Sequence, residues 1–357
     1  MLIYYHKHFL AILSSLDLNL TLRVFLQQVA NELQADAADV LILNLGTHLP
    51  EYSAGLGFAK GEIKETRFAL GQGHPGKAAL ERRNIYIDDR RVDKTFARKK
   101  LMQGEGFVTY FGMPLIAKGQ LSGVLEIFHR SLFRPTDRWL SFAETLAGQA
   151  SIAIDNASLF SGLQQTNVDL RIAYDRTLEG WSHALDLRDR ETEGHTQRVT
   201  SLCMKLAKEL NVPEDKLIHI RRGALLHDIG KMGIFDQILL KTSELTAEEK
   251  RAVDRHPTYA FELLSPISYL NPAMDIPYCH HERWDGCGYP RGLKGEVIPL
   301  PARIFAIVDV WDALTSDRPY RKAWPADQAL QYIREQAGKP FDPKIADTFA
   351  KMMDAVE

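Results

Sequence analysis

The sequence predicts a two-domain protein, in which an α+β domain is followed by a long connecting helix and an all-helical domain. Three observations predict this fold. Short β-rich segments occur only in the first half of the chain, and no proline interrupts the stretch between Pro135 and Pro213. After Trp181 the apolar residues recur with helical spacing. The 357 residues are enough to bury two separate hydrophobic cores.

The composition is that of an ordinary soluble protein, with 45% hydrophobic and 25% charged residues. A net charge of −2 gives no electrostatic reason to expect nucleic acid or an anionic membrane as partner. Cys203, Cys279 and Cys287 form no C-x-x-C pair and no even disulfide set, which favours a reducing compartment. The start lacks a signal-peptide cleavage site, and no apolar run has the length of a membrane span. We therefore expect a cytoplasmic protein that binds neither DNA nor membranes.

Residues 1–158 alternate between helical and strand-like segments. Helical spacing covers residues 8–33, and the apolar run "ADVLILN" is short enough for a strand. The stretch "GQGHPGKAALERRNIYIDD" predicts a loop, a short helix and a strand. Two β-rich runs flank the polar turn "AKGQ" and predict a hairpin, after which a helix begins near Pro135. These elements predict an antiparallel sheet flanked by helices.

The connecting helix is expected over residues 159–182, continuous with the helix before it. Apolar residues recur there at heptad-compatible spacing: Ile154, Leu159, Leu163, Val168, Leu170, Ile172 and Leu178. This spacing predicts a parallel pairing of two copies across a dimer axis. The alternative is a single amphipathic helix that packs on its own domain.

Residues 183–357 predict a helical bundle without strands. The expected helices cover residues 196–210, 214–231, 246–264, 301–316, 325–336 and 343–356.

The adjacent pair His227 and Asp228 lies in an otherwise apolar segment, "LLHDIGKMG". Burying two polar side chains costs free energy unless a partner satisfies them. A metal would do so, because a carboxylate can bridge two cations; a hydrogen-bonded His–Asp pair in the core is the alternative.

Further metal-ligand types occur on separate helical segments: Glu191, His195, His256, His280, His281, Asp309 and Asp312. Helical bundles that hold two or three metals have ligands projecting inward from different helices in this way. Glu191 and His195 are spaced i, i+4, which predicts that they lie one above the other on a helix face. Asp309 is expected to be buried within its apolar helix.

The order of the motifs "RDRETEGHTQRV", "LLHDIGKMGI", "RHP", "HHERWDGCGYP" and "VDVWDALTSDRPYR" resembles the HD-GYP subset of the HD phosphohydrolase superfamily, over about residues 183–350. This family hydrolyses the bacterial second messenger cyclic di-GMP to pGpG and, in many members, to GMP. The resemblance implies a metal-dependent phosphodiesterase. Cleavage of another cyclic dinucleotide, such as 3′,3′-cyclic GMP-AMP, and a receptor or docking module without catalysis remain as alternatives.

The resemblance also implies the metal ligands. The two-metal core would be held by His195, His227, Asp228, His256, His280, His281 and Asp309, with Asp228 bridging. Glu191 stands where many members carry tyrosine, and a glutamate there is associated with a third metal; a solvated carboxylate is the alternative. The resemblance favours iron and then manganese, whereas the ligand types by themselves also suit zinc.

Substrate contacts are expected around these ligands. Lys231, three residues after Asp228, is close enough to reach the scissile phosphate and to act in catalysis. Arg318 and Arg321 are expected to clamp phosphates, because guanidinium forks match phosphate oxygens. Tyr289 is expected to contact the ligand from the "GYP" loop, and Asp312 to orient a histidine from behind the metal.

Residues 1–158 resemble a GAF domain in the order of helix, strands, variable helical loop, the hairpin "FGMPLIAKGQLSGVLEIF" and returning helix. The resemblance implies a pocket for an unidentified small molecule over the sheet; a dimerisation domain without a ligand is the alternative. His74 and His129 are the histidines considered for haem, and both are expected in surface loops. We expect this domain to sense a signal that the connecting helix transmits.

Overall fold

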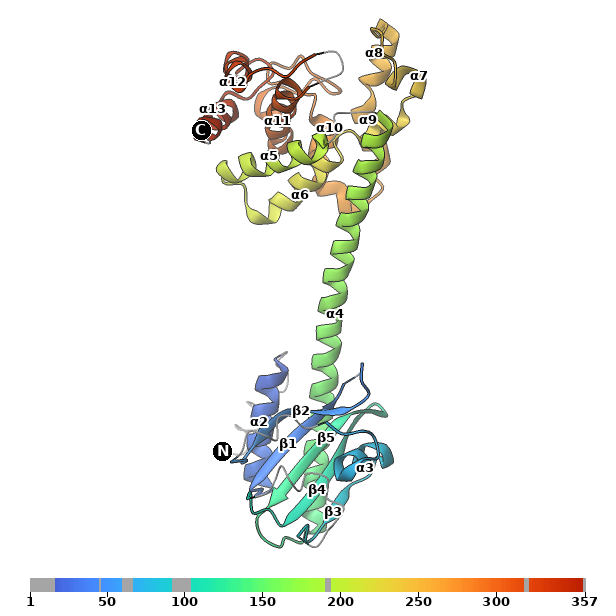
Figure 1. Cartoon of the computed structure of the whole chain (residues 1–357), viewed down its shortest axis with the longest axis vertical. Helices are drawn as coiled ribbons and strands as arrows, with labels where there is room; N and C mark the ends of the chain where they lie inside the picture. Colours follow the sequence, from blue (N-terminus) through green and yellow to red (C-terminus); the bar gives the residue numbers. More distant parts are fainter. Residues whose placement is uncertain are drawn as a thin grey trace. The chain divides into compact units, whose positions relative to one another are not determined.

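The computed structural model describes residues 17–44, 46–59, 67–91, 104–189, 194–317 and 321–355. It forms two compact units, Met1–Val168 and Asp169–Glu357. The division lies within helix α4, Asp137–Asp189, a single helix of 53 residues (Figure 1). The predicted continuous connecting helix is therefore confirmed, while the domain limits at residues 158 and 182 stay predictions.

The first unit contains a five-stranded antiparallel sheet with the strand order β2-β1-β5-β4-β3. The strands are β1 (Ala37–Leu43), β2 (Pro50–Leu56), β3 (Ile85–Ile87), β4 (Thr109–Ala117) and β5 (Gln120–His129). β4 and β5 form the predicted hairpin, which turns at Lys118 and Gly119 with φ of 49° and 77°. Positive φ at both central residues is the backbone of a type I′ turn, whose twist matches that of the flanking strands.

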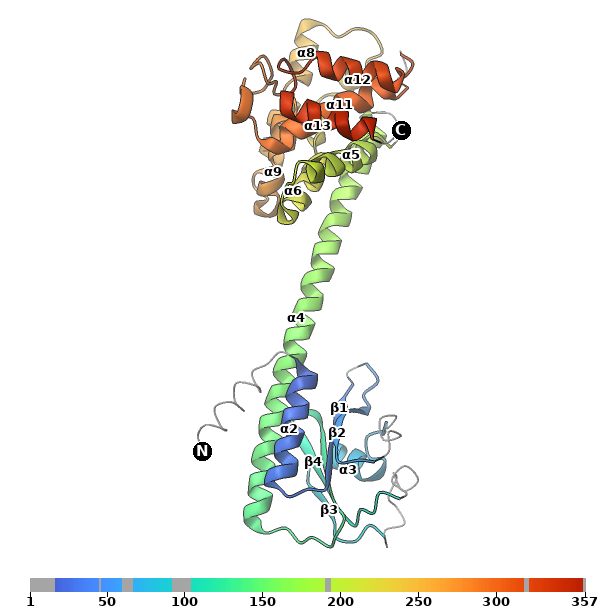
Figure 2. The same ribbon diagram turned by 90° about the vertical axis from the view of Figure 1, so that its left-hand side faces the viewer.

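Helices cover both faces of this sheet (Figure 2). Helix α2 (Leu18–Glu32) and the first part of α4 pack on one face, where Phe25 and Leu146 share a core with Ile127. Helix α3 (Gly73–Glu81) packs on the other face through Ala78 and Ala79. The predicted α+β architecture is confirmed.

The expected position of two histidines in surface loops is wrong. His74 lies in α3 and His129 ends β5, and both side chains are buried. The His129 ring stacks on Phe133 with 4.2 Å between the ring centroids. Sequence reasoning missed this burial because each histidine borders a turn segment, whereas the rings of Tyr110 beside His74 and Phe111 beside His129 come from strand β4.

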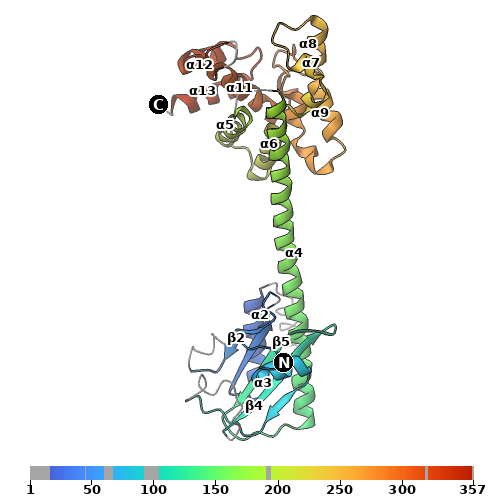
Figure 3. The same ribbon diagram turned by 45° about the vertical axis from the view of Figure 1, so that its right-hand side comes forward.

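The described part of the second unit is helical, as predicted (Figure 3). Its longer helices are α5 (His195–Glu209), α6 (Glu214–Leu225), α9 (His256–Leu264), α11 (Leu300–Thr315), α12 (Ala326–Glu335) and α13 (Pro343–Asp354). Its short helices are α7 (Asp236–Leu239), α8 (Ala247–Val253) and α10 (Asp275–Cys279), together with the 3-10 helices η2 (Ile229–Gly233), η3 (Ser268–Ala273) and η4 (Gly295–Val297). Val199, Phe305 and Phe349 lie in the main core.

Two expected helices are interrupted. The helix expected over residues 214–231 ends at Leu225, so His227 and Asp228 lie in a turn before η2. The helix expected over residues 246–264 is divided into α8 and α9. Both interruptions occur beside polar side chains of the candidate site, where tertiary contacts outweigh local helix propensity.

Within the ranges that the structure describes, no helix has both the length and the apolar character required to cross a bilayer.

Candidate metal centre

Seven side chains of the second unit converge on one place. They form two groups, His256 with His280 and His281, and His195 with His227 and Asp309. Within each group, one potential ligand atom from each residue lies within 4.8 Å of the others. The seventh side chain, Asp228, lies between the two groups.

The two oxygens of Asp228 face different groups. Its Oδ2 lies 3.0 Å from Nε2 of His227. Its Oδ1 lies 3.3 Å from Nε2 of His256 and 3.9 Å from Nε2 of His280. A carboxylate in this position can give one oxygen to each of two cations.

The turn after α6 makes this arrangement possible. Successive side chains on an α-helix point in different directions, so a helix would separate His227 from Asp228. Close packing of η2 on α9 then brings Asp228 to His256. At Gly230, an added Cβ would lie 1.8 Å from the backbone oxygen of His256, so only glycine permits this approach.

Backbone carbonyls set the proton positions of three histidines. Nδ1 of His227, His256 and His280 lies 2.8, 2.8 and 3.0 Å from the carbonyl oxygens of residues 224, 253 and 276. A carbonyl oxygen only accepts, so each Nδ1 carries the proton and donates it, and each Nε2 presents a lone pair.

The lone pairs meet in the centre of the site. Nε2 of His256 lies 3.2 Å from Nε2 of His280, and neither nitrogen has a proton to donate in this tautomer. A cation satisfies both nitrogens and the neighbouring carboxylate at once. Imidazole and carboxylate donors suit iron, manganese and zinc, so this donor set fits divalent metal binding.

Electrostatics keep the site in its metal-binding form. Burial lowers the pKa of His256 and His280 and brings the pKa of His281 to about 3, so these imidazoles are neutral at neutral pH. Burial acts to raise the pKa of Asp228, but the neighbouring His227 and Lys231 outweigh it and hold that pKa well below its usual value. Neutral imidazoles and an ionised carboxylate are the states that bind metals.

Asp312 and Arg198 support His195 from the side away from the other ligands. Nδ1 of His195 lies 2.7 Å from Oδ2 of Asp312, and Arg198 donates to both oxygens of the same carboxylate at 2.6 and 2.9 Å. Burial acts to raise the pKa of Asp312, but the hydrogen bonds from His195 and Arg198 bring it to about 2. Sequence reasoning missed Arg198, although its i+3 spacing from His195 was the available signal.

Lys231 connects the centre to the end of α4. Its Nζ lies 2.7 Å from Oδ2 of Asp228 and 3.1 Å from Oδ2 of Asp189, the last residue of α4. Tyr289 lies on the other side of the centre, with its ring 4.8 Å from that of His281. Burial, followed by the charge of Asp254, raises the pKa of Tyr289, so its hydroxyl stays protonated.

Glu282 holds the loop that carries Tyr289, and sequence reasoning missed it. Its buried carboxylate accepts the backbone N–H of Arg291 and of Leu293, both at 2.8 Å. The acid directly after the histidine pair is visible in the sequence, but its two backbone partners are not.

Glu191 and Arg318 lie outside the described residues, so their predicted roles stay predictions. Helix α5 begins at His195, and Gly194 before it has a left-handed φ of 75°. Arg321 donates to the carbonyl of residue 313 and lies over the ring of Trp324 at 5.5 Å. The expected burial of Asp309 is wrong, since its side chain is 27% exposed.

Two family models match the chain. The HD domain matches residues 181–345, and the GAF domain matches residues 17–154.

Curated relatives match about half of the chain. The cyclic di-GMP phosphodiesterase response regulator RpfG of Xanthomonas campestris is 42% identical over 177 residues, which cover 49% of this chain and 47% of that protein. A cyclic di-GMP phosphodiesterase of Thermotoga maritima is 43% identical over 171 residues, covering 47% and 46%. The 3′3′-cGAMP-specific phosphodiesterase 2 of Vibrio cholerae is 37% identical over 189 residues, covering 52% and 36%.

The chain thus spans about half or less of the length of these relatives. Together, the family matches, the antiparallel sheet and the helical metal centre identify the chain as a GAF domain followed by an HD domain.

Proposed function

We propose that the chain is a metal-dependent phosphodiesterase that hydrolyses cyclic di-GMP to pGpG and onward to GMP. The position of Asp228, with one oxygen facing each of two groups of potential ligands, is the observation that carries the proposal. Relatives named as cyclic di-GMP phosphodiesterases support the choice of substrate.

In this proposal His195, His227 and Asp309 would hold one divalent metal, His256, His280 and His281 would hold another, and Asp228 would supply a ligand oxygen to each. The bound metals would neutralise charge on the phosphodiester and lower the pKa of an attacking water. We propose iron as the resident metal, with manganese next, and Glu191 as a ligand of a third ion.

The remaining roles follow from the surroundings of the centre. Asp312 and Arg198 keep His195 oriented toward its metal. The ammonium group of Lys231, which is paired with Asp228, can turn to a phosphate oxygen of the substrate. There it would neutralise the negative charge that develops as the phosphodiester bond breaks. Tyr289 contacts the substrate from the loop held by Glu282, and Arg318 and Arg321 bind phosphates, for which Arg321 exchanges its carbonyl contact.

Hydrolysis of 3′,3′-cyclic GMP-AMP is a second candidate activity. Relatives from Vibrio cholerae carry names specific to that substrate, and they are 37% and 34% identical to this chain over 189 and 216 residues. A comparison of kcat/KM for the two cyclic dinucleotides distinguishes the candidates, because the metal centre would serve both.

The proposed activity is tested by turnover of cyclic di-GMP with anaerobically purified full-length protein and Fe(II) or Mn(II), followed by chromatography of the products. We expect Asp228→Asn to lower kcat more than about 100-fold, because the bridging charge is lost. Asp347→Asn, on the exposed face of α13, is the matched control and should retain the wild-type rate.

Absence of pGpG and GMP with either metal would contradict the proposed activity. If cyclic di-GMP still bound, the chain would be a receptor or docking module instead.

We also propose that the chain forms a homodimer through its first domain and α4. Six exposed apolar side chains support it: Ile152, Leu159, Leu163, Leu170, Tyr174 and Trp181. They follow one another at intervals of 7, 4, 7, 4 and 7 residues. At 3.6 residues per turn they lie within an arc of about 60°, and an 11-residue repeat gives helix pairs with a right-handed supercoil.

This stripe differs from the heptad seam expected from the sequence. Ile154 and Leu178 are buried in the cores of the two units, so they are not available for pairing. Val168 and Ile172 are exposed but lie on the opposite side of α4 from the stripe.

Regulation by the GAF domain is the last part of the proposal. The final turn of α4 reaches the centre through Asp189 and Lys231, so a shift of α4 would change the charge beside Asp228.

A further inference from the structure

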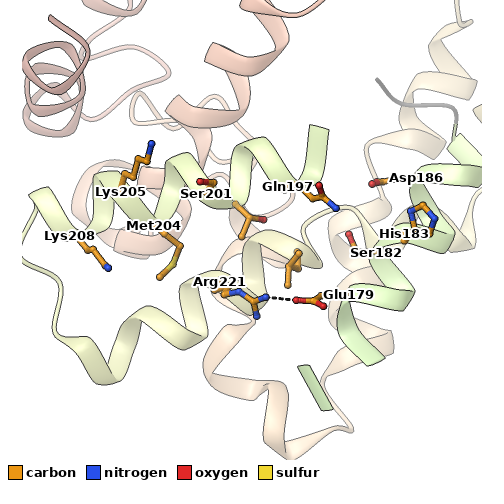
Figure 4. A pocket seen from close by; sticks show the side chains of 12 residues that line it. Glu179, Ser182, His183, Asp186, Gln197, Ser201, Met204, Lys205, Lys208 and Arg221 are labelled. Atoms are coloured by element: carbon orange, nitrogen blue, oxygen red, sulfur yellow. Dashed lines mark hydrogen bonds and ion pairs between the residues drawn. The ribbon is translucent and has the colours of Figure 1, made fainter. Parts of the chain in front are cut away.

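A cavity of about 610 Å³ lies in the second unit between the end of α4, α5 and α6 (Figure 4). Its volume is within the range of small-molecule sites. None of the residues that line it belongs to the metal centre. Met204 and Leu225 give it apolar surface, and charged groups lie at its ends.

The charges divide the cavity into two ends. Lys205 and Lys208, one turn apart on α5, make a cationic end, and neither forms an ion pair within the part of the chain that the structure describes. Arg221 is neutralised by its ion pair with Glu179. Asp186 of α4 lies at the other end and uses one oxygen to accept from Thr196 at 2.8 Å.

Thr200 lines the same cavity and is 7% exposed. Among the described residues, its hydroxyl oxygen has no hydrogen-bond partner. A buried hydroxyl without a partner costs about 1 to 3 kcal/mol, which a ligand with a polar group would recover. The hydroxyl therefore points to a ligand independently of the charges.

We propose that this cavity binds a nucleoside monophosphate. The phosphate would lie against Lys205 and Lys208, because a doubly charged phosphate matches two ammonium groups. The ribose would pack on Met204, and the base would lie at the other end and donate to Asp186. Guanine presents two adjacent N–H donors that match one carboxylate, and this choice of base rests on the proposed function, whose end product is GMP.

Spacing along α5 agrees with such a ligand. Lys205 lies eight positions after Gln197, which is about 12 Å along the helix axis. An extended nucleoside monophosphate spans this distance. The ligand would contact α4 and α5 together, and α5 begins with His195. A product bound here would therefore touch both the joining helix and a helix of the metal centre.

The test uses the full-length chain and 8-azido-GMP, with photolabelled peptides located by mass spectrometry and affinity measured by calorimetry with GMP. We expect label on peptides of α5 that follow Arg198 or on peptides of α4 that precede Asp189, which hold no residue of the metal centre. Lys205→Glu with Lys208→Glu should weaken binding there at least about 30-fold, because two charge-assisted contacts are reversed. Lys344→Glu with Lys351→Glu, an equal charge change at two exposed residues of α13, should leave affinity unchanged.

A milder variant guards against misfolding. Thr200→Val keeps the shape of the side chain and removes only the hydroxyl, so it should lower affinity about 5-fold, as expected for one hydrogen bond. Circular dichroism and melting temperature report whether each variant is folded.

Several outcomes would overturn the proposal. Label confined to peptides of the metal centre would do so, as would equal weakening by the α13 control. Competition by inorganic phosphate but not by guanosine would indicate an anion site only. A change in sedimentation of the unliganded lysine variant, with GMP affinity unchanged, would indicate an interface between copies. No cyclic dinucleotide is used, so failure of the proposed hydrolysis would leave this result interpretable.

Discussion

At the residue scale, Asp312 fixes the orientation and the proton position of the His195 ring. Its carboxylate accepts a hydrogen bond from Nδ1–H of His195, so the Nε2 lone pair of His195 points toward Asp309, 3.5 Å away. Arg198 compensates the charge of this buried acid. Partners of this kind fix the ring orientation and raise the basicity of a ligating histidine.

We predict that Asp312→Asn lowers the affinity for divalent metal about 10- to 100-fold, because the amide cannot take the negative charge that His195 and Arg198 require. Metal content after dialysis against buffered Mn(II), measured by mass spectrometry, checks this. Asp327→Asn at the exposed start of α12 is the control. Equal metal affinity in the wild type, Asp312→Asn and Asp327→Asn would show that Asp312 does not support the centre.

The buried histidines also predict how stability depends on pH. The pKa of His280 is lowered well below its usual value, and that of His281 to about 3, both mainly by burial. Below pH 6.5 the unfolded chain binds protons that the folded protein does not, so stability present above that pH is lost as the pH falls toward 3. Each histidine contributes up to about 1.4 kcal/mol per pH unit.

We therefore predict that the metal-free protein, in chelator, loses stability steeply between pH 7 and 5, as measured by the calorimetric transition of the second unit. His281→Asn should flatten this slope. His183→Asn, at an exposed position of α4, should not. If His281→Asn left the pH dependence of stability unchanged, the lowered pKa of His281 would not be its cause.

At the scale of elements, the contact between η2 and α9 positions the centre. Gly230 of η2 lies against the first turn of α9, where an added Cβ would also come within 2.6 Å of the backbone nitrogen of Ala260. The atoms in the way are backbone, which cannot move as a flexible side chain would. Asp228 and His256 therefore depend on one glycine for their approach.

We predict that Gly230→Ala destabilises the second unit by more than about 3 kcal/mol and reduces metal binding, because the helices must separate. Gly180→Ala is the matched control on α4, where an added Cβ meets nothing within 4 Å. It should stabilise the helix by up to about 1 kcal/mol. Chemical denaturation and metal content are measured for both variants. If Gly230→Ala were as stable as Gly180→Ala, the close packing of η2 on α9 would not require a glycine.

At the scale of the whole molecule, α4 is the element shared by both units. Its apolar stripe is exposed along much of its length, and Gly162 beside it leaves open space. A second copy of the same helix, packed against the stripe, would cover this apolar surface and explain a glycine in the helix interior.

We predict that Leu163→Glu with Leu170→Glu converts a dimer to a monomer in sedimentation equilibrium, because four charges would be buried in the pair. Val168→Glu with Ile172→Glu is the matched control, since these residues have similar exposure on the opposite side of α4. If the control dissociates the protein and the stripe variant does not, the pairing face is wrong.

Local sequence patterns were sufficient for the elements. The hairpin at Lys118 and Gly119, the uninterrupted α4 and the helical second unit all follow from turn chemistry, the absence of proline and helical spacing, which depend only on near neighbours along the chain. The same reasoning failed where distant segments meet. It extended a helix through His227 and placed His74 and His129 in surface loops.

For the candidate site, the sequence by itself determined which kinds of ligand are present and in what order. Only the tertiary structure decided that the two oxygens of Asp228 face different histidine groups, that Arg198 supports Asp312, and that Lys231 reaches Asp189. The physical reason is that these are distances of about 3 Å between segments far apart in the chain. Packing contacts such as that of Gly230 on α9 set those distances, and no local periodicity records them.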